Sequence, residues 1–245
     1  MRYDPDKHHR RSIRMRGYDY TQAGAYFITI CTQDRECLFG TIVDGCMHMN
    51  DAGRMVQSVW NEIPDHHPGV DVDAFVVMPN HVHGIIILTG ERAGAADDGG
   101  VGARPRACPV PRRDVHPLGK GQPRGVAPTS PPQPSGVAPT VDRGVAAAGK
   151  RMSLPDVVHR FKSLATARYR HGVYELGWPS FPGRLWQRNY YERIVRNEEA
   201  LSRIRHYILD NPARWKKDIE NPNTRPSPTV KESAAYYDAI SGNNA

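Results

Sequence analysis

The 245-residue sequence lacks the features that mark membrane-spanning, secreted or disulfide-rich proteins. No apolar run approaches the roughly 18 residues that a membrane-spanning helix needs. The first 16 residues are rich in charge and contain no apolar stretch like that of a secretory signal peptide. The four cysteines, Cys31, Cys37, Cys46 and Cys108, show no CxxC spacing, which is typical of reduced thiols. We therefore expect a cytoplasmic protein.

Aromatic residues are absent between Phe75 and Phe161, and much of this gap differs in composition from the rest of the chain. The stretch from about 90 to 149 holds 11 of the 22 glycines and 10 of the 21 prolines. Such a segment cannot bury enough apolar surface to offset the entropy lost when it becomes ordered. We therefore predict a disordered insert at 90–149. The other predicted parts are a basic N-terminal arm at 1–16, a folded domain over 17–217 that the insert interrupts, and a flexible C-terminal tail at 218–245.

Acidic residues are fewer than basic ones: the chain has 26 Asp and Glu and 33 Lys and Arg, which gives a formal net charge of +7. A basic balance of this size favours a polyanionic partner. Composition alone leaves nucleic acid and an anionic membrane surface as alternatives.

The hydrophobic pattern predicts an α+β domain. Strand-like runs lie at 26–32, 46–49, 70–78, 83–88 and 185–188. One helix is expected from the cap Asn50 or Asp51 up to Pro64, a second after the cap Ser153, and a third from about 197 to 209, ending before Pro212. This order fits a ferredoxin-like antiparallel sheet with helices packed on one face.

His81 and His83 form a His-Val-His motif at the start of an apolar strand. Alternate residues of a strand point to the same face, so both imidazoles are expected to project together and to reach one divalent ion. A pair of partly exposed strand histidines is the simpler alternative. Their position after Met78-Pro79-Asn80, at the entry to a buried strand, favours the metal site, because buried histidines need polar partners.

Tyr207 and Asn211 lie four residues apart on the last predicted helix and so share one face of it. A core tyrosine with its hydroxyl at the rim is one interpretation. The other is a covalent nucleophile supported by a cation, with the amide oxygen of Asn211 as a ligand of the same ion. Tyr190 and Tyr191 compete for the nucleophile role, but only Tyr207 has a potential ligand at i+4.

Four motifs in this order resemble the single-tyrosine HUH transposases of the IS200 type, and within them the REP-associated tyrosine transposases. The motifs are Arg16–Tyr20 running into Ala25–Thr29, Met78–His83, Leu185–Glu192 and Tyr207–Pro212. The resemblance spans about 140 residues outside the insert. It implies an HUH/Y1 transposase-like fold and an enzyme that cleaves and rejoins single-stranded DNA.

The resemblance also implies roles for individual residues. His81 and His83 match the two histidines of the HUH motif, Tyr207 matches the nucleophile that forms a 5′-phosphotyrosine, and Asn211 matches the third metal ligand. The family uses Mg²⁺ or Mn²⁺, whereas the ligand types alone favour Zn²⁺ or another imidazole-preferring ion. Its substrates are hairpin ends of palindromic repeats, and its members act as monomers or homodimers.

Clustered basic residues predict a DNA-binding track, because backbone phosphates attract cations. The candidates are Arg10, Arg11, Arg14, Arg16, Arg188, Arg203, Arg205, Lys216 and Lys217. One alternative function is a non-catalytic, transposase-derived regulator that only binds hairpin DNA, and the intact His81, His83, Tyr207 and Asn211 argue against it. Another is a nuclease that uses water, which needs a carboxylate beside the histidines. Around His81 the sequence offers none nearer than Asp73.

Overall fold

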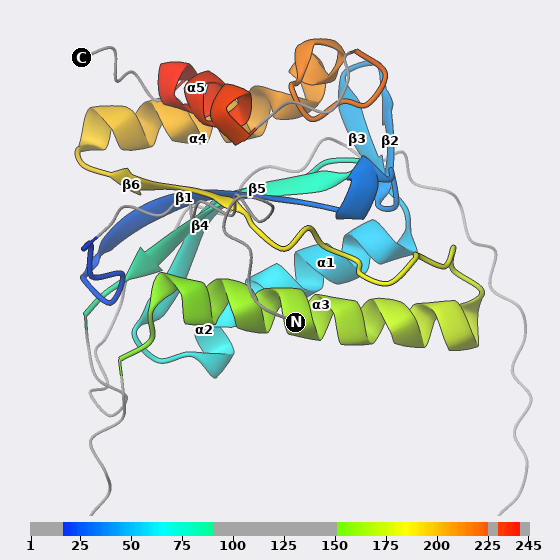
Figure 1. Ribbon diagram of the computed structural model, residues 1–245, viewed down its shortest axis with the longest axis horizontal. Helices are drawn as coiled ribbons and strands as arrows, with labels where there is room; N and C mark the ends of the chain where they lie inside the picture. Colours follow the sequence, from blue (N-terminus) through cyan, green and yellow to red (C-terminus); the bar gives the residue numbers. More distant parts are fainter. Residues whose placement is uncertain (1–16, 91–150, 225–229, 241–245) are drawn as a thin grey trace, which may run out of the picture. The chain divides into compact units, whose positions relative to one another are not determined.

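The computed structural model describes residues 17–90, 151–224 and 230–240, and all of them belong to one structural unit. The predicted arm at 1–16 and the predicted insert fall outside these ranges, apart from Gly90. Four strands form the central sheet (Figure 1). In spatial order they are β4 (Val70–Val77), β5 (His81–Leu88), β1 (Gly24–Cys31) and β6 (Tyr191–Val195), and every neighbouring pair is antiparallel.

The order of elements confirms the predicted α+β fold class. Between β1 and β4 the chain forms α1 (Asp51–Asn61) and α2 (Ile63–His66), and between β5 and β6 it forms α3 (Leu154–Leu176). This βαββαβ order, with β1 and β5 at the centre of the sheet, is ferredoxin-like. A hairpin of β2 (Gly40–Val43) and β3 (Cys46–Met49) forms a separate sheet, and its Asp44-Gly45 turn has the two positive φ angles, 49° and 75°, of a type I′ turn.

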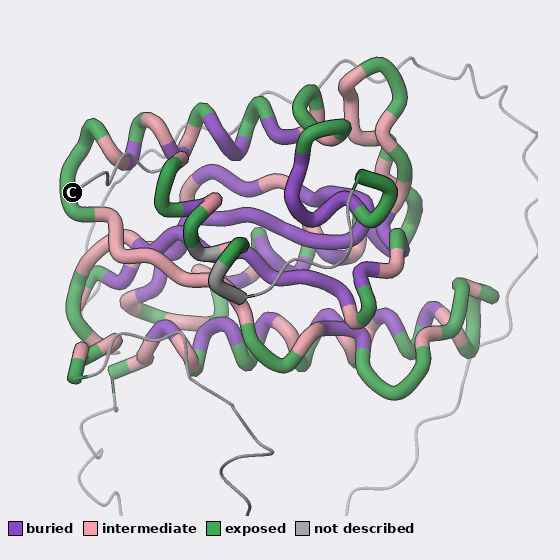
Figure 2. Tube along the Cα trace, turned by 45° about the horizontal axis from the view of Figure 1, so that its top comes forward, coloured by how far each residue is buried: buried purple, intermediate pink, exposed green. Residues whose placement is uncertain are grey.

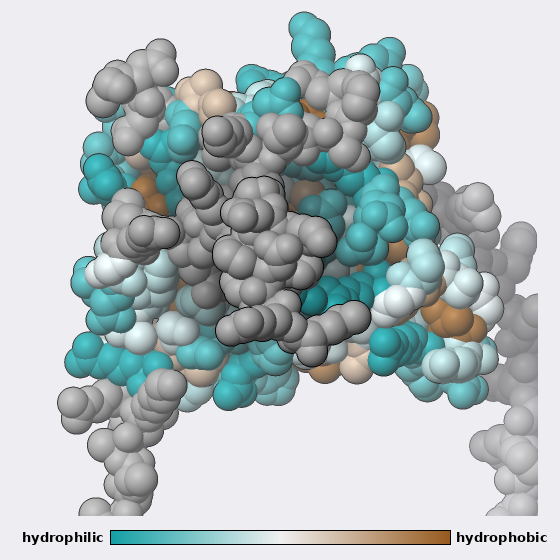
Figure 3. Space-filling view, viewed as in Figure 1, coloured by the Kyte–Doolittle hydropathy of each residue, from teal (hydrophilic) through white to brown (hydrophobic). Residues whose placement is uncertain are grey.

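Helices cover both faces of the sheet, and not one face as predicted. The helices α1 and α3 pack on one face, where Trp60 stacks on Phe75 with ring centroids 4.2 Å apart. The opposite face is covered by α4 (Glu198–Arg214) and α5 (Val230–Ile240) (Figure 1). The two central strands, β1 and β5, are therefore mostly buried from both sides (Figure 2). Most of the coloured part of the surface in Figure 3 is hydrophilic. Among the described helices, none is long and apolar enough to cross a membrane.

Local capping signals define the helix ends as the sequence predicts. The side chain of Asn50 accepts a hydrogen bond from the Gly53 amide at the start of α1. At the start of α3, Ser153 and Asp156 form a reciprocal capping box, and Gly177 ends the helix with φ +68°.

The prediction of a strand at 185–188 is wrong, because this segment forms only an isolated bridge, between Thr32 and Trp186. The Nζ of Lys162 on α3 donates to the carbonyl oxygens of residues 187, 188 and 189, which thus need no neighbouring strand. The edge strand is β6, which begins a few residues later and pairs with β1.

The last predicted helix also continues further than expected. Pro212 lies inside α4, which ends at Arg214 and is followed by the 3-10 turn η2 (Trp215–Lys217); a second such turn, η1 (Gln33–Arg35), follows β1. A proline in the last turn removes only its own N–H bond, so the helix tolerates it. The predicted flexible tail differs from the structure as well: Asp218 to Asn221 are buried, and Tyr237 of α5 is fully buried against the sheet.

We predict that Gly84→Ala strongly destabilises the fold. A Cβ at this position of β5 would lie 2.5 Å from two ring atoms of Trp60 and 2.9 Å from Phe75. Because both rings are closely stacked, neither is free to move away, and the free energy of unfolding should fall by about 3 kcal/mol. Urea denaturation measures this change. Ile87→Val on the same strand, at a half-buried site, is the control and should cost less than about 1.5 kcal/mol.

Candidate active site

His81 and His83 lie two residues apart on β5, and both side chains are fully buried. The ring of His83 lies against Tyr207 of α4 and Tyr237 of α5, and the ring of His81 lies against Trp215 of η2. Their Nε2 atoms face each other at 3.0 Å. Phe27 stacks against His83 with ring centroids 5.6 Å apart. The period of the strand thus brings the two imidazoles together, as the sequence predicts.

Hydrogen bonds orient both rings. The Asn80 Nδ2 donates to the carbonyl oxygens of Arg35 (3.1 Å) and Glu220 (2.8 Å), so its Oδ1 faces His81. This oxygen lies 2.8 Å from His81 Nδ1 and can only accept, so His81 carries its proton on Nδ1. Its Nε2 then has a lone pair, which accepts the hydrogen bond from His83 Nε2. The Nδ1 of His83 pairs with the Thr29 hydroxyl at 2.8 Å.

Burial keeps both histidines neutral. It lowers the pKa of His81 from 6.5 to about 4 and the pKa of His83 well below its usual value. Neutral imidazoles present lone pairs, which is the form that binds metal ions.

Helix α4 places Tyr207 against this pair. Its hydroxyl lies 3.3 Å from His83 Nε2, and the residue is only 4% exposed. The Arg205 guanidinium, paired with Asp73 on β4, fixes the helix to the sheet at this level. Burial and the negative charge of Asp218 raise the pKa of Tyr207 well above 10, so its phenol is protonated at neutral pH.

Asn211 lies one helical turn after Tyr207 and is fully buried. Its amide interacts with the Tyr207 hydroxyl, whose pKa it lowers against the larger effect of burial. No hydrogen bond of good geometry satisfies this amide among the described residues, and a ligand in the site would do so.

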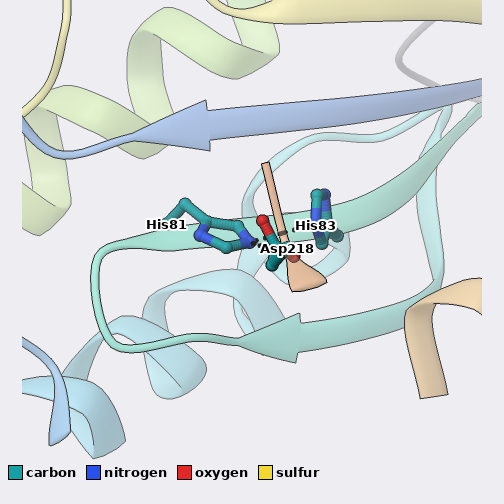
Figure 4. Close-up of side chains that lie close together, drawn as sticks. All are labelled: His81, His83 and Asp218. Atoms are coloured by element: carbon teal, nitrogen blue, oxygen red, sulfur yellow. Dashed lines mark hydrogen bonds and ion pairs between the residues drawn. The ribbon is translucent and has the colours of Figure 1, made fainter. Parts of the chain in front are cut away.

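Asp218 is the residue that sequence reasoning missed. Its Oδ2 lies 3.9 Å from His81 Nε2, and it is 1% exposed. One ligand atom each from His81, His83 and Asp218 lie within 4.8 Å of one another, and Figure 4 shows the three side chains pointing toward a common point. A carboxylate therefore does lie beside the histidines, contrary to the sequence-based argument against hydrolysis. Asp73, the nearest candidate in sequence, is instead paired with Arg205.

These residues fit a divalent metal ion. Two neutral imidazoles and a carboxylate converge at one buried point. The buried Asn211 amide lies one helical turn after Tyr207, which contacts His83. Nitrogen and oxygen donors in this combination suit first-row divalent ions.

The competing tyrosines lie in other contacts. The Tyr191 hydroxyl donates to Asp238 on α5 at 3.0 Å, and the Tyr190 ring lies 5.3 Å from Lys162 Nζ. The Tyr207 hydroxyl, by contrast, lies 3.3 Å from His83 Nε2.

The predicted DNA-binding residues fall into three groups. Arg10, Arg11, Arg14 and Arg16 lie outside the described residues. Arg188, Lys216 and Lys217 are exposed and accessible to phosphate. Arg203 and Arg205 are half-buried and form ion pairs with Glu199 and Asp73, so their charges are already engaged within the fold.

We predict that the metal-free protein loses stability as pH falls from 6.5 to about 4. In this range an unfolded histidine takes up a proton, whereas folded His81, with its pKa of about 4, does not. The unfolded state therefore binds more protons, and acid favours unfolding by on the order of 3 kcal/mol for His81 alone. Urea denaturation at pH 7.5 and pH 4.5 tests this, and His81→Asn should flatten the profile. Equal free energies of unfolding at both pH values in the unmodified protein would contradict it.

The chain has a relative among known proteins, although no protein-family model matches it. A Haemophilus influenzae protein, described as uncharacterized, is 34% identical over 219 residues, which span 89% of this chain and 96% of that protein. The chain belongs to the same family as this protein.

Among solved structures, a REP-associated tyrosine transposase bound to a REP hairpin is similar, with a TM-score of 0.42 and 15% identity. The match covers 83% of this chain and 74% of that one.

Proposed function

We propose that this protein is a metal-dependent, single-stranded DNA transposase or endonuclease that works through a covalent 5′-phosphotyrosine on Tyr207. The contact of the Tyr207 hydroxyl with His83 Nε2, beside His81, carries this proposal. It places a phenol oxygen at a site whose donors suit a divalent ion, as tyrosine transesterification requires. The resemblance of the motifs to REP-associated tyrosine transposases leads to the same chemistry.

In the proposed reaction Tyr207 Oη attacks a backbone phosphorus, the P–O3′ bond breaks, and the strand leaves with a free 3′-OH. His81, His83 and an oxygen ligand such as Asn211 would hold a Mg²⁺ or Mn²⁺ ion, which would act as a Lewis acid and stabilise charge on the phosphate. The tyrosine gives up its phenolic proton as it attacks, and the departing O3′ takes one up. Attack by another 3′-OH on the phosphotyrosine reverses these steps and joins two DNA ends without ATP.

Hairpin-forming single strands are the proposed substrate. The exposed Arg188, Lys216 and Lys217 supply cations for backbone phosphates. Lys216 and Lys217 directly follow α4, the helix that carries Tyr207. The arm at 1–16 contributes four more arginines to the proposed DNA-binding residues, Arg10, Arg11, Arg14 and Arg16. The proposed reaction takes place in the cytoplasm, with the protein acting as a monomer or homodimer.

The direct test is to incubate the protein with 5′- and 3′-labelled hairpin oligonucleotides from its own genomic flanks. Mg²⁺, Mn²⁺ or a chelator is added, and denaturing gels separate the products. The proposal predicts a metal-dependent protein–DNA adduct, with peptide mass spectrometry locating the nucleotide on Tyr207. Hairpin binding without an adduct in either metal would favour the non-catalytic regulator.

Asp218 supports a second candidate, metal-dependent hydrolysis by water, because a buried carboxylate beside two histidines is able to orient a nucleophilic water. The two reactions differ in their products. Hydrolysis leaves a free phosphate on one DNA end and no covalent protein, whereas transesterification leaves that phosphate on the tyrosine.

A further inference from the structure

The segment after α4 reaches back to the histidines. Residues Asp218, Ile219, Glu220 and Asn221 are each 4% exposed or less, although three of them are polar. Burial of consecutive polar side chains is costly unless they make specific interactions, so this segment is a built part of the site.

We propose that Asp218 is the anionic ligand of the ion that His81 and His83 bind, and that Glu220 and Arg35 position it. This inference rests on the metal site of the proposed function, but it assigns the acidic ligand to a different element of the fold. It transfers the third ligand from the Asn211 amide on α4 to a carboxylate on the following segment.

The geometry around Asp218 separates its two oxygens. Its Oδ1 accepts the backbone N–H of Glu220 at 2.6 Å, which holds the carboxylate in one orientation. Its Oδ2 is directed toward His81 Nε2 at 3.9 Å. That nitrogen carries no proton, and its lone pair, which accepts from His83 Nε2 here, is available to an ion once that hydrogen bond is given up. A divalent ion is bound more strongly by a carboxylate than by a neutral amide, because the carboxylate contributes a full negative charge.

Glu220 is held from two sides. The Arg35 guanidinium pairs with its Oε2 at 2.9 Å, and the Tyr237 hydroxyl of α5 donates to its Oε1 at 3.2 Å. Arg35 and its neighbour Asp34 have left-handed φ angles of 57° and 53°, an unfavourable backbone for non-glycine residues. With this backbone conformation the Arg35 side chain reaches Glu220 and forms the ion pair.

The same two residues also orient His81. The Asn80 amide that fixes the His81 ring donates to the backbone carbonyls of both Arg35 and Glu220. One scaffold, formed by a turn after β1 and by the segment after α4, therefore positions His81 and Asp218 together. Substitutions of Arg35 or Glu220 should therefore weaken metal binding, although neither side chain is a proposed ligand of the ion.

The test is Mn²⁺ binding to the full-length protein without DNA. Isothermal titration calorimetry gives the Kd. Quenching of Trp215 fluorescence provides a second signal, because this ring lies 6.0 Å from His81; Trp215→Phe identifies its share of the emission. Asp218→Asn should weaken binding by more than about 100-fold and remove the rise in melting temperature that Mn²⁺ causes. Glu220→Gln should weaken it by about 10-fold.

Two controls make the result specific. Asp210→Asn removes an exposed carboxylate near the same helix end and should change the Kd by less than about twofold. His81→Ala should abolish binding. Melting curves recorded in the absence of metal check that each variant folds. If Asp218→Asn does not fold, the Mn²⁺ affinity of Glu220→Gln tests the proposal instead.

The outcomes separate the two proposals. Unchanged Mn²⁺ affinity in Asp218→Asn, with loss in His81→Ala, would overturn the role of Asp218 and leave the metal site intact; Asn211→Ala should then carry the loss. Absence of Mn²⁺ and Mg²⁺ binding in the unmodified protein would overturn this inference together with the metal dependence of the proposed function. DNA cleavage that fails despite normal metal binding would count against the proposed function alone.

Discussion

Tyr207→Phe is expected to abolish the covalent DNA adduct, with at least a 10³-fold lower rate of strand cleavage, on the order of the loss when a covalent nucleophile is removed. The substitution removes one oxygen, the atom that lies 3.3 Å from His83 Nε2. The same hydroxyl also interacts with Tyr236 and Asn211. Its loss should therefore lower the free energy of unfolding by about 1–2 kcal/mol, which leaves the variant folded. A loss of activity in a folded variant then reports the chemistry, measured by denaturing gels with saturating Mn²⁺.

The matched controls are Tyr190→Phe and Tyr191→Phe, which remove the same atom from the two competing tyrosines. Both should retain the adduct. Metal binding should also persist in Tyr207→Phe, because none of the proposed ligand atoms is altered. An adduct that survives Tyr207→Phe would transfer the nucleophile role to another tyrosine.

Much of the candidate site follows from local periodicity. The two-residue period of a strand suffices to place His81 and His83 on one face, and the helical period places Tyr207 and Asn211 on another. The caps Asn50 and Ser153 are equally local, because each bonds the amide three residues later. Such features depend only on neighbours in sequence, and the structure contains them where the sequence predicts them.

What the sequence did not predict depends on contacts between distant parts of the chain. Asp218 meets His81 only because the segment after α4 folds back, and no spacing in the sequence indicates this. The prediction of a flexible tail failed for the same reason, a contact between distant parts of the chain. The tail shows little apolar periodicity, yet Tyr237 packs against His83 on the sheet. Leu185 and Trp186 look like a strand because they are apolar, but they are buried in the core without a ladder.

The position of α5 has a consequence for access to the site. The ring of Tyr237 lies 5.7 Å from that of His83 and 6.5 Å from that of Tyr207 and is itself fully buried. In the proposed reaction a phosphodiester must reach the Tyr207 hydroxyl, which belongs to a residue that is only 4% exposed. The proposed function therefore predicts that α5 moves before cleavage and that the fraction of molecules with α5 displaced limits the rate.

Asp238→Arg is accordingly expected to increase the rate of adduct formation by about tenfold. In the full-length protein Asp238 joins α5 to β6, through Arg193 at 2.8 Å and the Tyr191 hydroxyl at 3.0 Å. Replacing it with arginine puts two like charges together, and a loss of about 1.4 kcal/mol in docking energy raises a small displaced population about tenfold. Single-turnover adduct formation on hairpin DNA at saturating Mn²⁺ measures the effect.

The charge-swapped double variant, Arg193→Asp with Asp238→Arg, separates displacement of α5 from a new DNA contact. It restores an ion pair between α5 and β6 and should return the rate to near that of the unmodified protein, although it keeps the added arginine. If the double variant stays as fast as Asp238→Arg, the arginine acts on the DNA and not on the helix. If Asp238→Arg is no faster at all, docking of α5 through this pair does not limit the reaction, and DNA reaches Tyr207 by another route.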